Sequence, residues 1–259
     1  MEPFTITVGL PTMNEELNVG PLCDKLKSFK ERQSELFKGR AVLEEAIFVL
    51  NNTTDDTEKV LDSIRSKRGY KFVKISRSGG YRGSAIRRAA DLAQGNVFVM
   101  MDSDGQYNPC NIREVVTPVI EGRYKMVIAR DWQVGEPWRN MVSLVYEEMT
   151  RLLLGLYTVQ GGLKAMLTED GRDTIPKDVP GLDIDVEWAN RVKEVFGCDA
   201  ISYVRVPAYP REEGRTKVNV VGLSLGLAYT TARLAIKEWT GRDMPFPEKL
   251  KELTLRPRR

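Results

Sequence analysis

Short apolar runs alternate along the first half of the chain with segments in which apolar residues recur every three or four positions. The runs are typical of strands buried on both faces, and the spaced segments are typical of helices that pack back on a sheet. The predicted strands are residues 4–10, 46–50, 71–75, 96–101 and 126–128. The predicted helices carry Leu17, Leu22, Leu26 and Phe29, then Val60, Leu61 and Ile64, then residues 85–93. This rhythm predicts an α/β fold with a right-handed βαβ sheet and helices on both faces.

A pair of carboxylates directly follows the apolar run that ends at Met101. Asp102 and Asp104 stand two residues apart, so their side chains point the same way from an extended backbone. Such close carboxylates repel each other unless a hard cation such as Mg²⁺ or Mn²⁺ shares them. The pattern therefore predicts a divalent cation site, with the alternative that Asp-Ser-Asp-Gly is only a polar turn ending a strand.

Two further loops each lie between a predicted strand and a predicted helix. Residues 51–57 are a dense cluster of capping residues, equally typical of a helix N-terminus and of a nucleotide-contacting loop at the carboxyl edge of a parallel sheet. Residues 78–84 are rich in glycine, which lets backbone amides approach a phosphate closely. The Gly-Lys-Ser/Thr ending of a Walker A loop is missing from this turn.

Composition narrows the function classes. The 259 residues, 42% hydrophobic and 29% charged, suffice for one large domain or for one domain with an appendage. A net charge of +3 with dispersed basic residues argues against nucleic-acid binding. Cys23, Cys110 and Cys198 are too widely spaced for a zinc site and indicate free thiols in a reducing compartment. The chain has no His, so chemistry near neutral pH depends on carboxylates, cations and a metal.

Seven segments, taken in order, resemble the GT-A glycosyltransferases of family 2, in particular their dolichol-phosphate mannose synthase-like branch. The family's Pro-x-x-Asn-Glu loop resembles residues 10–16, its acidic nucleotide loop resembles 51–57, and its Gly-Lys-Gly turn resembles 80–83. Its Asp-x-Asp motif resembles residues 102–106. Its Ser-Arg, Ser-Gly-Phe-Arg and Arg-x-x-Gly-x-Ser-Lys segments resemble residues 129–130, 160–165 and 210–217. Two positions depart from the pattern. Asn51-Asn52 replaces Asp-Asp, which leaves the nucleotide base open, and Arg82 replaces Lys.

The resemblance implies a GT-A catalytic domain over residues 1–217, followed by an amphipathic helix and basic tail over 218–259. It also implies site residues, which we carry over position by position. The implied metal ligands are Asp104, Gln106 and Asp102. The implied catalytic residues are Asp102, Asp104, Arg130 and Arg211. The implied substrate-binding residues are Pro11, Asn14, Glu15, Asn51, Asn52, Arg82, Gly83, Asp102, Ser103, Arg139, Arg215 and Lys217.

The implied activity is metal-dependent, inverting transfer of a hexose from a nucleotide sugar to a polyprenyl or dolichyl phosphate, with Mg²⁺ or Mn²⁺ as cofactor. GDP-mannose is the expected donor, before UDP-glucose. The alternatives are transfer to a sugar hydroxyl of a glycan or glycolipid, a sugar-1-phosphate nucleotidyltransferase, and a nucleotide-sugar-binding module without catalysis.

The acceptor decides whether a general base is needed. A phosphate acceptor is already anionic and needs positive charge, whereas a sugar hydroxyl must lose a proton. Asp185 and Glu187, at the start of a predicted helix, are candidates for that base, or they only complement the helix dipole. If the acceptor is a phosphate, Asp185→Asn and Glu187→Gln are expected to leave turnover nearly intact.

Two stretches indicate contact with a membrane. Residues 218–232 and 138–157 are apolar or amphipathic, and the first is too short to span a bilayer. Each is equally typical of a core or dimer helix. No secretory signal peptide is predicted, because residues 4–10 are too short and lack a basic leader. The expected location is cytoplasmic, peripherally associated with the cytoplasmic face of a membrane.

Overall fold

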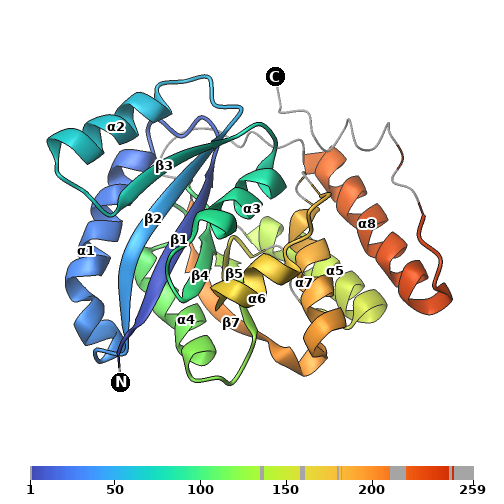
Figure 1. Ribbon diagram of the computed structural model, residues 1–259. Helices are drawn as coiled ribbons and strands as arrows, with labels where there is room; N and C mark the ends of the chain where they lie inside the picture. The colour runs from blue at the N-terminus through green and yellow to red at the C-terminus, as the bar shows by residue number, and fades with distance from the viewer. Residues whose placement is uncertain are drawn as a thin grey trace.

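The computed structural model describes residues 2–134, 137–157, 161–179, 181, 183–210, 220–244 and 247. Through the middle of this described part runs a seven-stranded sheet, in the order β3-β2-β1-β4-β6-β5-β7 (Figure 1). The strands are β1 (Phe4–Thr12), β2 (Ala41–Asn51), β3 (Val73–Ser78), β4 (Val97–Met101), β5 (Met126–Gln133), β6 (Leu163–Leu167) and β7 (Ile201–Ala208). β6 runs antiparallel to both of its neighbours, and the other neighbouring pairs are parallel. The predicted α/β fold is confirmed.

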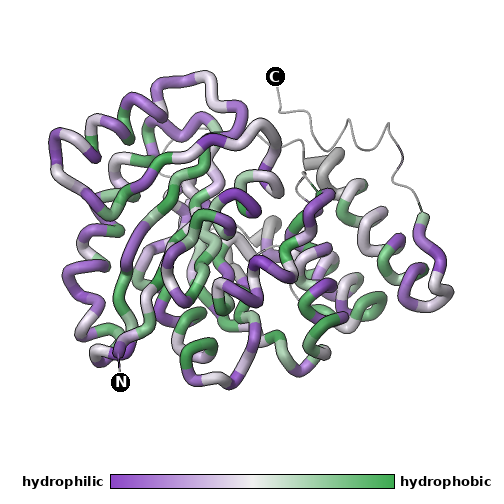
Figure 2. The backbone as a smooth tube through the Cα atoms, viewed as in Figure 1, coloured by the Kyte–Doolittle hydropathy of each residue, from purple (hydrophilic) through white to green (hydrophobic). Residues whose placement is uncertain are grey.

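Helices cover both faces of this sheet (Figure 1). They are α1 (Val19–Phe37), α2 (Thr57–Lys67), α3 (Arg82–Leu92), α4 (Ile112–Ile120), α5 (Pro137–Leu154), α6 (Thr168–Thr174), α7 (Ile184–Phe196) and α8 (Val220–Thr240), with the 3₁₀ turns η1 (Pro109–Asn111) and η2 (Cys198–Ala200). One hydrophobic cluster joins α1, α2 and α4 to the sheet, and a second joins α3, α5, α7 and α8 to it. Figure 2 shows the same arrangement, with largely hydrophobic strands in the middle and the mainly hydrophilic helices α1 and α2 outside them. Apolar burial on both faces is therefore what holds the layers together.

The observed boundaries correct several of the predicted ones. β2 begins at Ala41 instead of residue 46, β3 covers Val73–Ser78 instead of 71–75, and β5 continues to Gln133. α3 begins at Arg82, so the cation of the glycine-rich turn is the first residue of a helix. Leu17, expected on the buried face of the first helix, precedes α1 and is 56% exposed. Polar residues within β2 interrupt its apolar run, so the apolar pattern predicted too late a start for this strand. A charged residue can lie buried inside a strand when it has hydrogen-bonding or charged partners.

Glu45 is that buried charge. Its Oε1 accepts hydrogen bonds from Thr7 Oγ1 at 2.8 Å and from the Gln94 amide at 2.7 Å, and Oε2 pairs with Lys74 Nζ. Burial alone would raise the pKa of Glu45, but these three partners outweigh it and hold the pKa below its ordinary value. The folded state therefore favours the ionised carboxylate, which links β1, β2, β3 and the turn before β4.

We expect Glu45→Gln to lower the free energy of unfolding at pH 7 by about 1–3 kcal/mol, because a charge-assisted pair is lost while glutamine keeps an acceptor. Because the folded-state pKa is depressed, the stabilisation by Glu45 is complete above the ordinary pKa of 4.5 and is lost as the pH falls through the folded value. Urea unfolding of both proteins between pH 7 and pH 3 measures this. A difference that stays constant over that range would contradict the assignment.

The C-terminal helix α8 packs against α5 and α7 rather than standing apart from the fold (Figure 1). Lys193 Nζ on α7 pairs with Glu238 Oε2 at 2.7 Å, and Tyr146 Oη on α5 lies 3.3 Å from Thr231 Oγ1. Burial of Leu227, Leu234 and Ala235 adds an apolar contact. This part of the predicted amphipathic C-terminal segment thus contributes to the second core.

Candidate functional site

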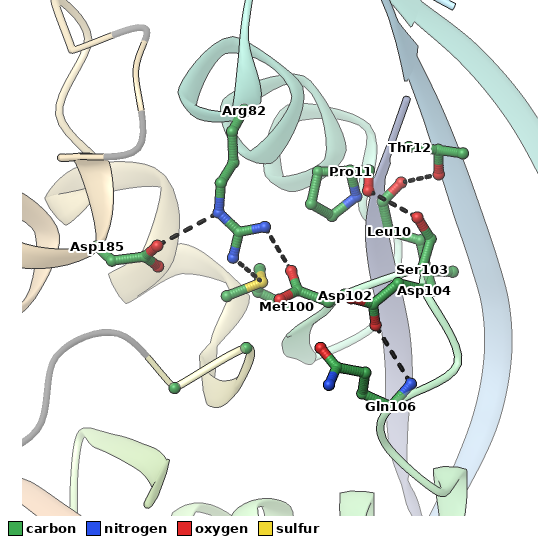
Figure 3. Close-up of polar contacts among 12 residues, drawn as sticks. Leu10, Pro11, Thr12, Arg82, Met100, Asp102, Ser103, Asp104, Gln106 and Asp185 are labelled. Atoms are coloured by element: carbon green, nitrogen blue, oxygen red, sulfur yellow. Dashed lines mark hydrogen bonds and ion pairs between the residues drawn. The ribbon is translucent and has the colours of Figure 1, made fainter. Parts of the chain in front are cut away.

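The carboxyl ends of β1, β2 and β4 lie side by side at one edge of the sheet. The loops that follow these strands begin at residues 13, 52 and 102. Ser103 Oγ donates to the Pro11 carbonyl at 2.9 Å and so fixes the Asp102–Asp104 turn against the end of β1 (Figure 3). Three of the segments singled out by sequence therefore meet at one edge, where open α/β sheets bind their ligands.

Asn14 and Glu15 join the first loop to the second. Asn14 has φ 54°, and its Oδ1 accepts the Thr54 amide at 2.7 Å. The Glu15 amide donates to Thr57 Oγ1 at 2.8 Å, at the first residue of α2. Both residues therefore shape the edge through contacts between the loops, and their predicted role in substrate binding stays a prediction.

Asn51 is the last residue of β2 at this edge, and Asn52 is the first residue of the loop that follows. Asn51 is buried, and its Oδ1 accepts no hydrogen bond from the described residues. The Oγ of Ser78, its register partner on β3, is likewise buried and unsatisfied within the same described ranges. Asn52 is exposed and has φ 51°. Buried polar atoms normally have hydrogen-bond partners, so Asn51 and Ser78 mark a place where a polar group of a ligand fits.

A chain of alternating charges lies beside the aspartate pair (Figure 3). Arg82 Nη1 pairs with Asp102 Oδ1, and Arg82 Nε lies 3.3 Å from Asp185 Oδ2. The other oxygen of Asp185 accepts from Lys164 Nζ at 2.5 Å, and that ammonium also donates to the Gly161 carbonyl at 2.7 Å. The four side chains come from α3, the end of β4, α7 and β6. Sequence reasoning placed Lys164 in the segment 160–165 that resembles the family's Ser-Gly-Phe-Arg motif, but did not name it as a site residue.

This arrangement keeps Asp185 ionised. Burial would raise its pKa, but Lys164 and Arg82 together hold it below the ordinary aspartate value. Burial likewise opposes the charge of Arg82, and Asp102 and Asp185 outweigh it, so its pKa lies above the usual arginine value. Asp185 therefore accepts hydrogen bonds from Lys164 and Arg82 as an ionised carboxylate.

Gly161 and Gly162 bring β6 close to the aspartate turn. A Cβ on Gly162 would lie 2.3 Å from Asp102 Oδ2 and 2.7 Å from Tyr107 Cε2. A Cβ on Gly161 would lie 2.0 Å from the Ala129 carbonyl oxygen. The Gly162 amide donates to Tyr107 Oη at 2.8 Å, and the Asp102 amide donates to the Gly162 carbonyl at 2.9 Å. Only glycine leaves room for the Asp102 carboxylate here, and Tyr107 is a further site residue that sequence reasoning missed.

The donor set at this turn fits a hard divalent cation. Asp102 and Asp104 offer carboxylate oxygens, the ligands that Mg²⁺ and Mn²⁺ prefer, and the missing side chain of Gly162 lets the Asp102 carboxylate lie against β6. The described part of the chain holds no group of three or more His, Cys, Asp or Glu suited to a metal. A cation at this turn would therefore complete its shell with oxygens from a bound ligand or water. Gln106, the third predicted ligand, donates its Nε2 to the Tyr209 carbonyl at 3.1 Å.

Other charged residues named from the sequence have partners elsewhere. Arg130, expected to face the diphosphate, binds Glu147 on α5 through two nitrogens, at 2.9 Å and 2.6 Å to Oε2. Glu187, a candidate base, pairs with Arg233 on α8. Gly83 is buried in the first turn of α3. The functional roles predicted for Arg130 and Gly83 stay predictions.

Several predicted residues cannot be placed. Arg211, Arg215, Lys217 and the motif residue Gln160 lie outside the described residues. Arg139 belongs to the first turn of α5, and its side chain also lies outside the described part. Cys23, Cys110 and Cys198 are free thiols, as predicted. In the part of the chain that is described, no helix has both the length and the apolar character needed to cross a bilayer.

Comparison with known proteins gives two kinds of match. The model of the family described as "Glycosyl transferase family 2" matches residues 7–158. The "Uncharacterized glycosyltransferase YkcC" of Bacillus subtilis (strain 168) is 28% identical over 154 residues, which cover 58% of this chain and 44% of that protein. The match thus spans less than half the length of this relative.

Solved structures share the fold. Glucosyl-3-phosphoglycerate synthase from Mycobacterium tuberculosis, in complex with Mn²⁺, UDP-glucose and phosphoglyceric acid, is similar with a TM-score of 0.66 at 20% identity, over 90% of this chain and 79% of that one. Its complex with Mn²⁺, UDP and phosphoglyceric acid gives 0.67 at 18% identity, over 94% and 80%. At these identities the likeness establishes the fold alone.

Proposed function

The chain belongs to glycosyl transferase family 2, and we propose that it transfers a hexose from a nucleoside diphosphate sugar to the phosphate of a polyprenyl lipid, with inversion and with Mg²⁺ or Mn²⁺ bound. The observation that carries this proposal is the joint placement of the aspartate turn, the unsatisfied Asn51 and the cation Arg82 at one sheet edge. These features suit, in turn, a metal, a nucleobase and a diphosphate.

Each part of the edge has a separate task in this reaction. Asp102 and Asp104 would hold the cation, which when bound neutralises charge that builds up on the leaving diphosphate. Arg82 adds a second positive charge next to Asp102. Asn51 has a free acceptor within the described residues and an amide that can also donate, so it can read the edge of a base.

The donor we propose first is UDP-glucose, because solved structures of the same fold contain UDP-glucose with Mn²⁺. GDP-mannose, which the sequence resemblance favours, is the second candidate. Both carry a diphosphate and differ in the base that Asn51 would contact. Binding of UDP and of GDP in the presence of Mn²⁺, measured by calorimetry, separates them, and Asn51→Asp should change their ratio.

The pairing of Asp185 and Glu187 supports a phosphate as the acceptor. Asp185 is held by Lys164 and Arg82, and Glu187 is held by Arg233, so neither stands ready to remove a proton. An acceptor that arrives as a phosphate anion needs none removed. The sequence alone led us to expect nearly intact turnover in Asp185→Asn. The pairing of Asp185 changes that expectation to a loss, since the variant leaves Lys164 buried beside a neutral group and removes a charged partner of Arg82.

Transfer of labelled hexose tests the proposal directly. Each donor is offered with polyprenyl phosphate, with phosphoglyceric acid and with a lipid-linked sugar that presents only hydroxyl groups. Labelled polyprenyl phosphate hexose as the main product supports the proposal. Product formed only on the hydroxyl acceptors overturns the choice of acceptor, and binding of donor without turnover overturns the enzymatic assignment.

A lipid acceptor also suits the exposed surface of α5. Because β6 runs antiparallel to β4 and β5, those two strands point the same way, and α5 begins near the edge that holds the aspartate turn. Along α5, apolar side chains are exposed at Met141, Leu144, Val145 and Leu152. We include contact of this helix with a membrane surface in the proposal.

We expect Leu152→Asp to weaken binding to vesicles that contain anionic phospholipid by about tenfold, since burying a leucine side chain contributes roughly 1.5–3 kcal/mol. Cosedimentation measures the bound fraction. Val195→Asp, an equally polar change at an exposed position on α7, is the control. Equal binding of the two variants would argue against α5 as the contact surface.

A further inference from the structure

The four charged side chains beside the aspartate turn differ in burial, and their exposure increases from Lys164 toward Asp102. Lys164 is fully buried and the side chain of Asp185 is 7% exposed, whereas Arg82 and Asp102 are 16% and 27% exposed. One end of the chain of charges is therefore fixed inside the protein, and the other reaches the site. Arg82 connects the two ends through different nitrogens, Nε toward Asp185 and Nη1 toward Asp102.

The buried end is built to stay in place. Lys164 has two acceptors, Asp185 Oδ1 and the Gly161 carbonyl, and Asp185 has one oxygen for Lys164 and one for Arg82. Removing Asp185 leaves the buried Lys164 without a charged partner, which proteins tolerate poorly, and removing Lys164 leaves Asp185 with Arg82 alone. Losing a partner at the Asp102 end costs less, because Arg82 and Asp102 are both more exposed than Lys164 and Asp185.

Charge balance at Asp102 then limits what can bind. Lys164 already pairs with Asp185, and Arg82 already pairs with both Asp185 and Asp102. A divalent cation that approached Asp102 would meet the guanidinium already paired with that carboxylate. Like charges a few ångström apart in a partly buried site repel strongly, whereas a diphosphate can accept both.

Building on the proposed function, we propose that Arg82 is an internal counter-cation of the metal site. Asp185, fixed by Lys164, holds the guanidinium on Asp102 while the site has no ligand, and the guanidinium turns from Asp102 to the diphosphate when metal and nucleotide bind together. Asp185 is thus a positioning residue that acts through Arg82. The consequence is antagonism between Arg82 and free metal at Asp102, and cooperation between them once a nucleoside diphosphate is present.

Binding of Mn²⁺, followed by electron paramagnetic resonance without any sugar donor, tests this. We expect Arg82→Gln to bind Mn²⁺ about tenfold more tightly than the unmodified protein when no nucleotide is present, because a competing cation is gone. With UDP or GDP added, we expect the order to reverse, since the diphosphate has lost its second cation. Arg68→Gln, which removes an exposed arginine paired with Asp24, makes the same change in net charge as a control.

The outcomes separate the counter-cation role of Arg82 from the proposed transfer of a hexose. Unchanged or weaker Mn²⁺ binding by Arg82→Gln without nucleotide overturns the counter-cation. This test needs no turnover, so it remains decisive even if no hexose is transferred and the proposed function fails. Normal transfer with no effect of Arg82→Gln on Mn²⁺ overturns the counter-cation alone.

The role of Asp185 has its own test, on the paired variant Asp185→Asn/Lys164→Met, which removes the buried charge that Asp185→Asn alone would leave. A positioning role predicts that the double variant regains the thermal stability lost in Asp185→Asn and that both variants keep the acid limb of the kcat/KM pH profile. Loss of that limb in both variants would show that Asp185 is a general base and would overturn the inference.

Discussion

Asp104→Asn is expected to abolish Mn²⁺-dependent nucleotide binding and to lower turnover by at least about 100-fold, the scale on which loss of charge stabilisation slows enzymes. Asp104 is buried at the end of β4, and its Oδ1 accepts the Gln106 amide at 3.2 Å. Asparagine keeps that acceptor and the side-chain volume, so the loop retains its shape. What is lost is one of two carboxylates in a site with few ligands of its own.

Calorimetric titration of nucleoside diphosphate with and without Mn²⁺ measures this loss. Asp62→Asn, which removes an exposed carboxylate paired with Arg65 on α2, is the matched control. Metal-dependent turnover in Asp104→Asn as high as in that control would show that the cation binds elsewhere.

Gly162→Ala is expected to lower turnover by about 100-fold while the protein stays folded, because shifts of about 1 Å in a reacting site have effects of that size. The added methyl would lie 2.3 Å from Asp102 Oδ2 and 2.7 Å from the Tyr107 ring. Both contacts are too short to persist, so the Asp102 carboxylate, the Tyr107 ring or the backbone at Gly162 must shift, and a shift at Asp102 changes the geometry of the carboxylate pair. The change adds no charge and removes no hydrogen-bonding group, so its effect reports on geometry.

Gly20→Ala is the control, since a Cβ on Gly20 in α1 would meet no atom within 4 Å. Alanine there should leave activity unchanged and favour the helix. Thermal unfolding of both variants, together with donor binding, distinguishes a damaged site from a damaged fold. Full activity of Gly162→Ala would show that the space beside Asp102 is not needed.

Much of the fold followed from the sequence because its determinants are local. The apolar run of residues 97–101 is typical of a strand buried on both faces, and such a strand places the following Asp102 and Asp104 at the carboxyl edge of the sheet. Strands β1 and β2 were found for the same reason. The order of seven short motifs was sufficient to indicate the family, which the match over residues 7–158 established.

Local rules failed where a polar group was buried. Lys164 lies in the middle of β6 and Glu45 lies inside β2, and each is stabilised by partners far away in the sequence. Periodicity treats such residues as breaks in a strand. This is why the start of β2 was placed too late and β6 was not predicted at all.

The sequence by itself determined that an apolar strand delivers two carboxylates to an edge lined by a capping loop and a glycine-rich turn. Only the tertiary structure decided which charges meet there. Arg82 reaches Asp185 across 103 positions of sequence, and Arg130, expected in the same site, pairs instead with Glu147. Electrostatic pairing depends on distance and burial after folding, and neither is encoded in the spacing of residues along the chain.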